Sequence, residues 1–300
     1  MDILLQQLIN GLTVGGIYAL IALGYTMVYG ILKLINFAHG DLTVLGAYIG
    51  LTVLTGGLSS GAPSGWLIVA AFIIAVVVIA AAGILLERVA YRPLRRAPRL
   101  SAVVSALGAS LLIENGIMLI WSPQIKVFPD NLLPNVSWTL GGAVINSTQL
   151  FIIVASFALM LGLYLYVYKT RFGTAIRACA IDQDTALLMG VNVNRVIAIV
   201  FIIGPALGAL GGLFIGLYYR QLYFTLGWQY GLNAFIAAII GGIGNIPGAM
   251  LGGLLLGLFN ALGAGYVSSA WQGAITFVLL ILILLIRPSG ILGERVAEKV

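Results

Sequence analysis

Residues 150–168 read LFIIVASFALMLGLYLYVY, an uncharged run that is long enough to cross a bilayer as a single α-helix. Residues 68–86, IVAAFIIAVVVIAAAGILL, form another such run, and no charged residue occurs from Gln221 to Ile286. The chain has 61% hydrophobic residues, 8% charged residues and a mean hydropathy of +1.10, whereas a soluble domain has about 25% charged residues. The sequence therefore predicts an all-α polytopic membrane protein and excludes a soluble globular domain.

The hydrophobic spans define a single transmembrane domain over residues 1–300, because no linker or change in composition marks a second domain. We expect spans at 9–31, 36–57, 66–86, 101–121, 150–168, 196–218, 229–246, 249–267 and 271–286. Some of these are separated by so few residues that broken or re-entrant helices are expected, which gives about eight to ten helices. The largest loop between spans, 122–149, contains proline and asparagine and is expected to form an irregular cap.

The distribution of Lys and Arg predicts the orientation in the membrane. Five arginines crowd the loop after the third span, which the positive-inside rule places in the cytoplasm. Alternation then puts every one of the 15 Lys and Arg residues except Lys126 and Arg220 on the same side. We therefore expect the N-terminus outside and the C-terminus in the cytoplasm, and we interpret the net charge of +6 as an orientation signal rather than a nucleic-acid site.

The loop 169–195 (KTRFGTAIRACAIDQDTALLMGVNVNR) carries four cations and two acids between two hydrophobic spans. Its middle is expected to form a short helix, with Thr174 as a candidate N-cap and Gly190 as the left-handed residue that ends it. Its repeated alanines and aliphatic residues favour a surface that binds another protein over a merely solvated loop.

Three polar breaks within the hydrophobic sequence are candidate sites. Asn36–Asp41 (NFAHGD) contains the only histidine of the chain and is either an exposed turn or unwound backbone along a transport pathway. Glu114 and Asn115 lie inside the fourth span, where an acid is either functional or a buried structural carboxyl. The run 241–248 (GGIGNIPG) resembles the first break in its placement, which is compatible with an internal inverted repeat.

Glycines recur every four residues at Gly204, Gly208, Gly212 and Gly216, and again at Gly244, Gly248 and Gly252. Small residues at this spacing predict close helix packing, and a dimer interface is an additional use that the pattern allows.

Several classes of chemistry are excluded. A single cysteine, Cys179, rules out an internal disulfide, and one histidine without a cysteine cluster makes a metal site improbable, so we expect no metal and no cofactor. No lysine follows a glycine, so the chain has no phosphate-binding loop of the Walker A type. Any ATP hydrolysis must therefore occur in a separate subunit.

Four segments together resemble the shorter-subunit branch of the branched-chain amino acid ABC transporter permease family. They are residues 17–24 (IYALIALG), 34–41 (LINFAHGD), 239–249 (IIGGIGNIPGA) and 287–293 (RPSGILG). The resemblance extends over essentially the whole chain. It implies an ABC importer permease fold in a bacterial inner membrane, paired with a longer homologous permease. It also implies two cytoplasmic ATP-binding subunits and a periplasmic substrate-binding protein.

Within this resemblance, residues 184–190 (DTALLMG) are similar to the loop with which ABC permeases bind the ATPase, although Thr185 stands where alanine is usual. The expected contact residues are Arg177, Asp182, Asp184, Thr185, Ala186 and Gly190. The expected residues of the substrate pathway are Asn36, His39, Gly40, Asp41, Glu114, Asn115 and Asn245.

Three alternatives remain open at this point. A permease of the same family could carry urea or short amides, and a proton-coupled secondary transporter could use Glu114 and His39. An intramembrane protease would need a serine paired with His39, for which the sequence contains no motif.

Overall fold

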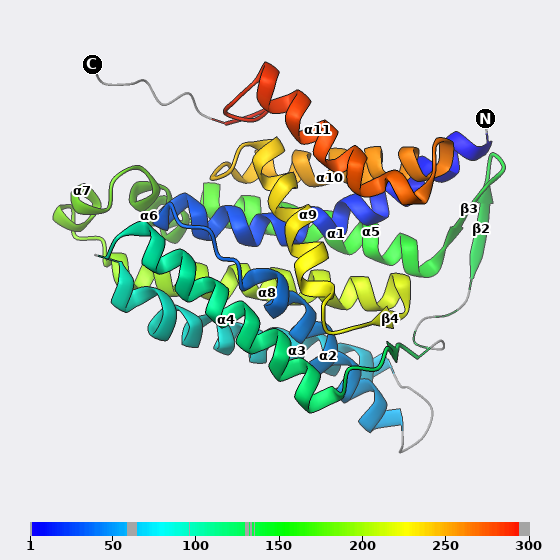
Figure 1. Cartoon of the computed structure of the whole chain (residues 1–300), viewed down its shortest axis with the longest axis horizontal. Coiled ribbons are helices and arrows are strands. Elements are labelled where there is room, and N and C mark those ends of the chain that lie inside the picture. The colour runs from blue at the N-terminus through cyan, green and yellow to red at the C-terminus, as the bar shows by residue number, and fades with distance from the viewer. Residues whose placement is uncertain are drawn as a thin grey trace.

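The computed structural model describes residues 2–58, 65–95, 97–129, 132, 134 and 136–293, which fold into a bundle of long helices (Figure 1). Nine helices correspond to the nine expected spans: α1 (Asp2–Leu32), α2 (His39–Leu58), α3 (Gly65–Leu86), α4 (Arg99–Trp121), α5 (Ser147–Lys169), α8 (Val193–Tyr219), α9 (Leu226–Gly241), α10 (Ile246–Tyr266) and α11 (Gln272–Ile286). Short helical segments add α6 (Arg171–Ile181), α7 (Gln183–Leu188), η1 (Glu87–Tyr91), η2 (Arg92–Leu94) and η3 (Ser269–Trp271).

Seven helical segments in the described residues are long and apolar enough to cross a membrane, so the expected class of all-α multi-pass membrane protein is confirmed. Helices α2 and α9 are not among these seven. With 16 residues, α9 is about 24 Å long, which is less than the roughly 30 Å of a hydrocarbon core. Helices α2 and α9 are therefore the ones that correspond to the expected broken or re-entrant helices.

Several expected boundaries were wrong, and the largest shift is at α1, which begins at Asp2 where residue 9 was expected. Helix α2 begins at His39, not at residue 36, because residues 33–36 form no regular secondary structure, with a positive φ of 54° at Lys33, and a turn follows at 37–38. Helix α9 ends at Gly241, not at residue 246, because Gly242 and Gly244 adopt positive φ angles of 105° and 97°. Such angles end a helix and favour glycine.

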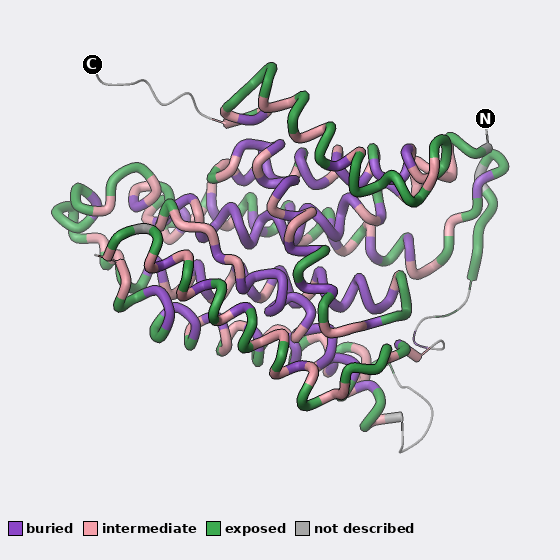
Figure 2. The backbone as a smooth tube through the Cα atoms, in the orientation of Figure 1, coloured by how far each residue is buried: buried purple, intermediate pink, exposed green. Residues whose placement is uncertain are grey.

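Helix α1 lies in the centre of the bundle and packs against α5, α8, α9 and α10. Its residues 17–23 are all buried, and buried residues concentrate in the central helices in Figure 2. Glycines allow the close contacts: Gly204 lies against Gly24 of α1, and Gly212 lies against the backbone of Thr43 in α2. The predicted packing use of this glycine row is confirmed, and the row is buried inside this chain instead of facing a second copy.

Helices α6 and α7 lie at one end of the bundle, and the N-terminus lies at the opposite end beside a β-hairpin (Figure 1). The hairpin pairs β2 (Ser137–Leu140) with β3 (Ala143–Asn146) across Gly141 and Gly142, both with positive φ. Two short strands, β1 (Lys126–Val127) and β4 (Gln221–Leu222), also pair at this end. The expectation of an irregular cap over 122–149 was therefore wrong for the segments that form strands.

Candidate functional site

The break between α1 and α2 ends close to the level of the middle of the spanning helix α4. Ser110 is the middle residue of the spanning helix α4, and its hydroxyl donates a hydrogen bond to the Asp41 carboxylate in the first turn of α2. The start of α9 lies at the same place, because any side chain at Gly227 would overlap Asp41. Two discontinuous helices thus meet near the bilayer midplane, where many transporters place their substrate sites.

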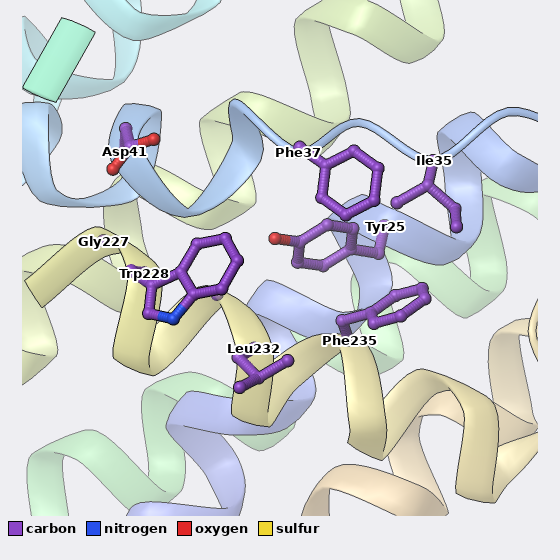
Figure 3. Close-up of a pocket in the computed structure, with 9 residues that line it drawn as sticks. Tyr25, Ile35, Phe37, Asp41, Gly227, Trp228, Leu232 and Phe235 are labelled. Atoms are coloured by element: carbon purple, nitrogen blue, oxygen red, sulfur yellow. The ribbon is translucent and has the colours of Figure 1, made fainter. Parts of the chain in front are cut away.

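A small pocket opens at this meeting point (Figure 3). We call it the Asp41 pocket, and it is a shallow hollow that is open on one side. It is lined by Tyr25, Ile35, Phe37, Asp41, Gly227, Trp228, Gly231, Leu232 and Phe235. The pocket therefore combines aromatic walls with one carboxylate. Among its residues, only Asp41 had been predicted as a pathway residue.

The predicted acids lie close together. Glu114 follows Ser110 by one helical turn on α4, is half-buried, and interacts electrostatically with Asp41. Its neighbour Asn115 is exposed on the surface of the chain and donates from Nδ2 to the Leu111 carbonyl at 2.7 Å. Polar groups exposed at membrane depth are costly against lipid, so this face of α4 requires protein or water opposite it.

His39 is held between helices instead of facing an open space. Its side chain is 0% exposed, its Nε2 lies 3.1 Å from the Ile21 carbonyl, and its ring packs edge-on against Tyr25 at 4.7 Å. Because that carbonyl accepts, Nε2 carries the ring proton. Gly24 and Gly208 leave room for the ring, since a side chain at either would crowd it. This geometry fits a packing role between α1, α2 and α8.

Asn36 and Gly40 complete the first break. The Asn36 side chain is buried, and its Oδ1 accepts a hydrogen bond of 3.1 Å from the Tyr91 hydroxyl. Gly40 packs directly on Gly227 and Gly231 of α9. Both residues thus fix the break against its neighbours.

Asn245 lies at a different place. Its Oδ1 accepts from the Gly248 amide at 2.9 Å, which caps α10, and its Nδ2 donates to the Leu292 carbonyl at 2.9 Å. It does not line the Asp41 pocket. The structure gives it a capping role, and its place in a pathway stays a prediction, as does the inverted repeat.

The loop 169–195 forms two helices, α6 and α7, where a single one was expected. Thr170 caps α6 by accepting from Gly173, so the expected cap at Thr174 was wrong, because Thr174 lies inside the helix. Asp182 caps α7, and hydrogen bonds from the Thr185 backbone and hydroxyl and from the Asp184 amide lower the pKa of its carboxyl. A lowered pKa means that the cap stabilises α7 above the ordinary aspartate pKa and that this stabilisation is lost as the pH falls through the lowered value. Gly190 has the expected positive φ, at 85°.

Four aliphatic side chains of this loop are strongly exposed: Ile181 (88%), Leu187 (60%), Leu188 (87%) and Met189 (81%). We call them the α7 patch. None of these four was predicted as a contact residue. The predicted contact residues differ in accessibility: Asp182, Asp184, Thr185 and Gly190 are exposed, whereas Ala186 is buried. Arg177 is exposed and lies over the Tyr168 ring at 5.2 Å. An open groove runs beside α7 toward Arg92 and Arg95.

Hydrogen bonds lead from this loop to the end of α1 and to the segment that contacts the break. Gln183 of α7 donates from Nε2 to the Ile31 carbonyl at the end of α1, at 2.7 Å. Arg95 forms an ion pair with Glu87, and its Nη1 donates to Asn194 Oδ1 at 2.6 Å. Tyr91, four residues after Glu87 in the π-helical segment η1, reaches Asn36 in the break.

Sequence reasoning missed Ser110, Tyr25, Trp228 and the pair Glu87 and Arg95. Each looks ordinary in the sequence, as a small residue in a helix, an aromatic residue near an interface or a charge in a basic loop. Their roles appear only from partners that are distant in the sequence, such as Asp41, which lies 69 residues from Ser110.

Comparison with known proteins gives consistent matches. The family described as "Branched-chain amino acid transport system / permease component" matches residues 7–284. The chain is 44% identical to the high-affinity branched-chain amino acid transport system permease protein LivH of Escherichia coli (strain K12), over 99% of this chain and 97% of LivH. It is 46% identical to BraD of Pseudomonas aeruginosa, which has the same description, over 99% and 98%. A shorter match, 32% identical over 43% of this chain and 42% of its relative, is to the ribose import permease protein RbsC of Bacillus subtilis.

Proposed function

This chain belongs to the branched-chain amino acid transport system permease family, and from that premise we propose that it is the transmembrane subunit of an ATP-driven importer of branched-chain or other neutral amino acids. The near full-length similarity to LivH and BraD carries the proposal. The chain is a multi-pass membrane protein of the permease class. ATP is hydrolysed by two separate cytoplasmic subunits.

The further partners are a longer homologous permease in the same membrane and a periplasmic binding protein that delivers the substrate. The compartment is a bacterial inner membrane, with the C-terminus in the cytoplasm. The segments that carry Arg92, Arg95, Arg171 and Arg177 support this orientation, because they lie at the α6–α7 end of the bundle.

Residues 169–195 act as the coupling loop of the single domain 1–300. The α7 patch supports this role, because exposed aliphatic clusters on a water-facing surface are typical of protein contacts. Movement of α7 is transmitted to α1 through the Gln183 hydrogen bond and to α8 through the short covalent connection at 189–192. Substrate passes along the face that carries Asp41, Glu114 and Asn115.

Uptake competition tests the substrate assignment. Cells that lack their own leucine uptake systems and express the assembled importer are given labelled leucine. Excess isoleucine or valine is expected to suppress uptake, and excess urea is expected to leave it unchanged. Suppression by urea or a short amide, without suppression by isoleucine and valine, contradicts the assignment.

The hydrogen bond from Gln183 provides a test of the coupling route. Gln183→Ala and Gln183→Glu both remove the donor to the Ile31 carbonyl, a bond worth about 1 kcal/mol. We expect leucine uptake per ATP hydrolysed to fall several-fold in both variants, while the ATPase subunits stay bound. The measurement is uptake and hydrolysis in the same proteoliposomes.

Gln272→Ala is the matched control, because Gln272 is exposed at the start of α11. It should keep the wild-type ratio of uptake to hydrolysis. An unchanged ratio in both Gln183 variants rules out this contact as the route.

A further inference from the structure

We propose that the Asp41 pocket holds the amino acid in transit, with the Asp41 carboxylate binding the substrate ammonium group and the aromatic walls contacting its aliphatic side chain. This inference rests on the proposed function and assigns the residues that act on the substrate.

Asp41 has the chemistry for an ammonium group. Its side chain is 3% exposed, and Ser110 donates to Oδ2. No described Lys or Arg forms an ion pair with it. Oδ1 lies against Gly227. Because glycine has no side chain, it leaves room for the carboxylate at the edge of the pocket. A carboxylate held at membrane depth without a cationic partner is a functional candidate, because burying it is costly.

Glu114 adds a second acidic side chain near Asp41. It lies one helical turn after Ser110, the partner of Asp41, and it interacts electrostatically with Asp41. Two adjacent acids favour a cation and disfavour an anion. The zwitterion is therefore expected to enter with its ammonium toward α2 and α4, and with its carboxylate toward the open mouth.

The walls of the pocket fit an aliphatic side chain. The hydroxyl of Tyr25 points into the space between Phe37 and Trp228, and Phe235 and Leu232 lie further along α9 (Figure 3). Phe37 and Phe235 are half-buried and Trp228 is 60% exposed, so apolar surface is available at the mouth. A branched side chain covers more of this surface than the methyl group of alanine does.

The position of Asp41 favours a polar occupant over lipid. Asp41 lies at the level of the middle of α4, and the non-helical residues 33–38 precede its helix. Non-helical backbone at membrane depth is tolerated where it contacts protein or lines an aqueous cavity. A pocket with one carboxylate and apolar walls binds weakly, which permits release during transport.

The test measures ligand binding to the assembled permease and ATPase complex in lipid nanodiscs, without the binding protein. Saturation-transfer difference NMR compares leucine with 4-methylpentanoate, which lacks the ammonium group. Wild type is expected to bind leucine more tightly than 4-methylpentanoate. Asp41→Asn is expected to weaken leucine binding about tenfold or more and to leave 4-methylpentanoate unchanged. Equal loss of both ligands, or no loss of leucine, overturns the proposal, as does absence of leucine binding to wild type.

A second variant tests the walls without touching the buried carboxylate. Trp228→Ala should weaken leucine binding several-fold and alanine binding little, because truncation removes contact with the longer side chain. Trp66→Ala is the control, because Trp66 is 83% exposed at the start of α3 and does not line the pocket. Equal effects of the two substitutions contradict the assignment. ATP-driven leucine uptake by the wild-type importer, measured separately, tests the proposed function itself.

Discussion

Replacing Leu188 with glutamate is expected to weaken binding of the ATPase subunits about 10- to 100-fold and to reduce leucine uptake accordingly. Leu188 is 87% exposed on α7, so it makes few contacts within its own chain. Covering a leucine at an interface contributes about 1.5–3 kcal/mol, and each 1.4 kcal/mol corresponds to a factor of ten in affinity. Glutamate removes this contribution and adds a charge that the interface would have to bury. Co-purification of the ATPase with this chain measures the effect.

Two controls separate docking from folding. Leu188→Met keeps an aliphatic side chain of similar size and should retain the ATPase. Val127→Glu introduces the same charge at another exposed aliphatic residue, 65% exposed in β1, and should also retain it. The docking assignment is wrong if Leu188→Glu co-purifies with the ATPase as well as Val127→Glu does.

Replacing Arg95 with alanine is expected to lower the free energy of unfolding by about 3 kcal/mol. Glu87 is buried, with 4% of its side chain exposed, and Arg95 is its ion-pair partner. Removing one member of a buried pair leaves the other charge without compensation, which costs about 3–5 kcal/mol. Because 18% of the Arg95 side chain is exposed, we expect the lower end of this range. Equilibrium unfolding in mixed detergent micelles measures the change.

The double variant Glu87→Gln with Arg95→Ala provides the internal control. It removes both charges and should recover most of the lost stability. Asn194→Ala removes only the hydrogen bond to Arg95 and should cost about 1 kcal/mol. A double variant as unstable as Arg95→Ala would show that the ion pair is not the source of the stability.

The helices were predictable because hydrophobicity and length decide them. Residues 150–168 and 68–86 each became a spanning helix, α5 and α3, with boundaries shifted by a few residues. Gly190 was predictable because a left-handed residue after an aliphatic helix favours glycine. These features depend on neighbours in the sequence.

The remaining features depend on contacts between distant segments. The depth of Asp41 follows from its bond to Ser110, and nothing in α4 distinguishes that serine from an ordinary small packing residue. The division of 169–195 into two helices follows from the extended backbone of Asp182, which an aspartate surrounded by helix-forming residues does not reveal. Gly227 allows α9 to approach Asp41, a use of glycine that only the tertiary structure shows.

A short series of contacts connects the coupling loop to the Asp41 pocket. Gln183 contacts the last turn of α1, and residues 33–38 follow directly. Asp41 lies in the first turn of α2 and has its partner Ser110 on α4. The Gln183 contact at Ile31 and the Asp41 pocket are thus separated only by the end of α1 and the break at 33–38. This short connection gives α7 a direct mechanical route to the pathway.

Leucine uptake into proteoliposomes distinguishes a subunit of an ATP-driven importer from a secondary transporter. The liposomes contain this chain with its partner permease and two ATPase subunits, and they are supplied with the binding protein. We expect uptake only with ATP inside the compartment that holds the ATPases, and none when any subunit is omitted. Uptake driven by a pH gradient, with this chain as the only protein in the liposomes, would contradict the account and identify a secondary transporter.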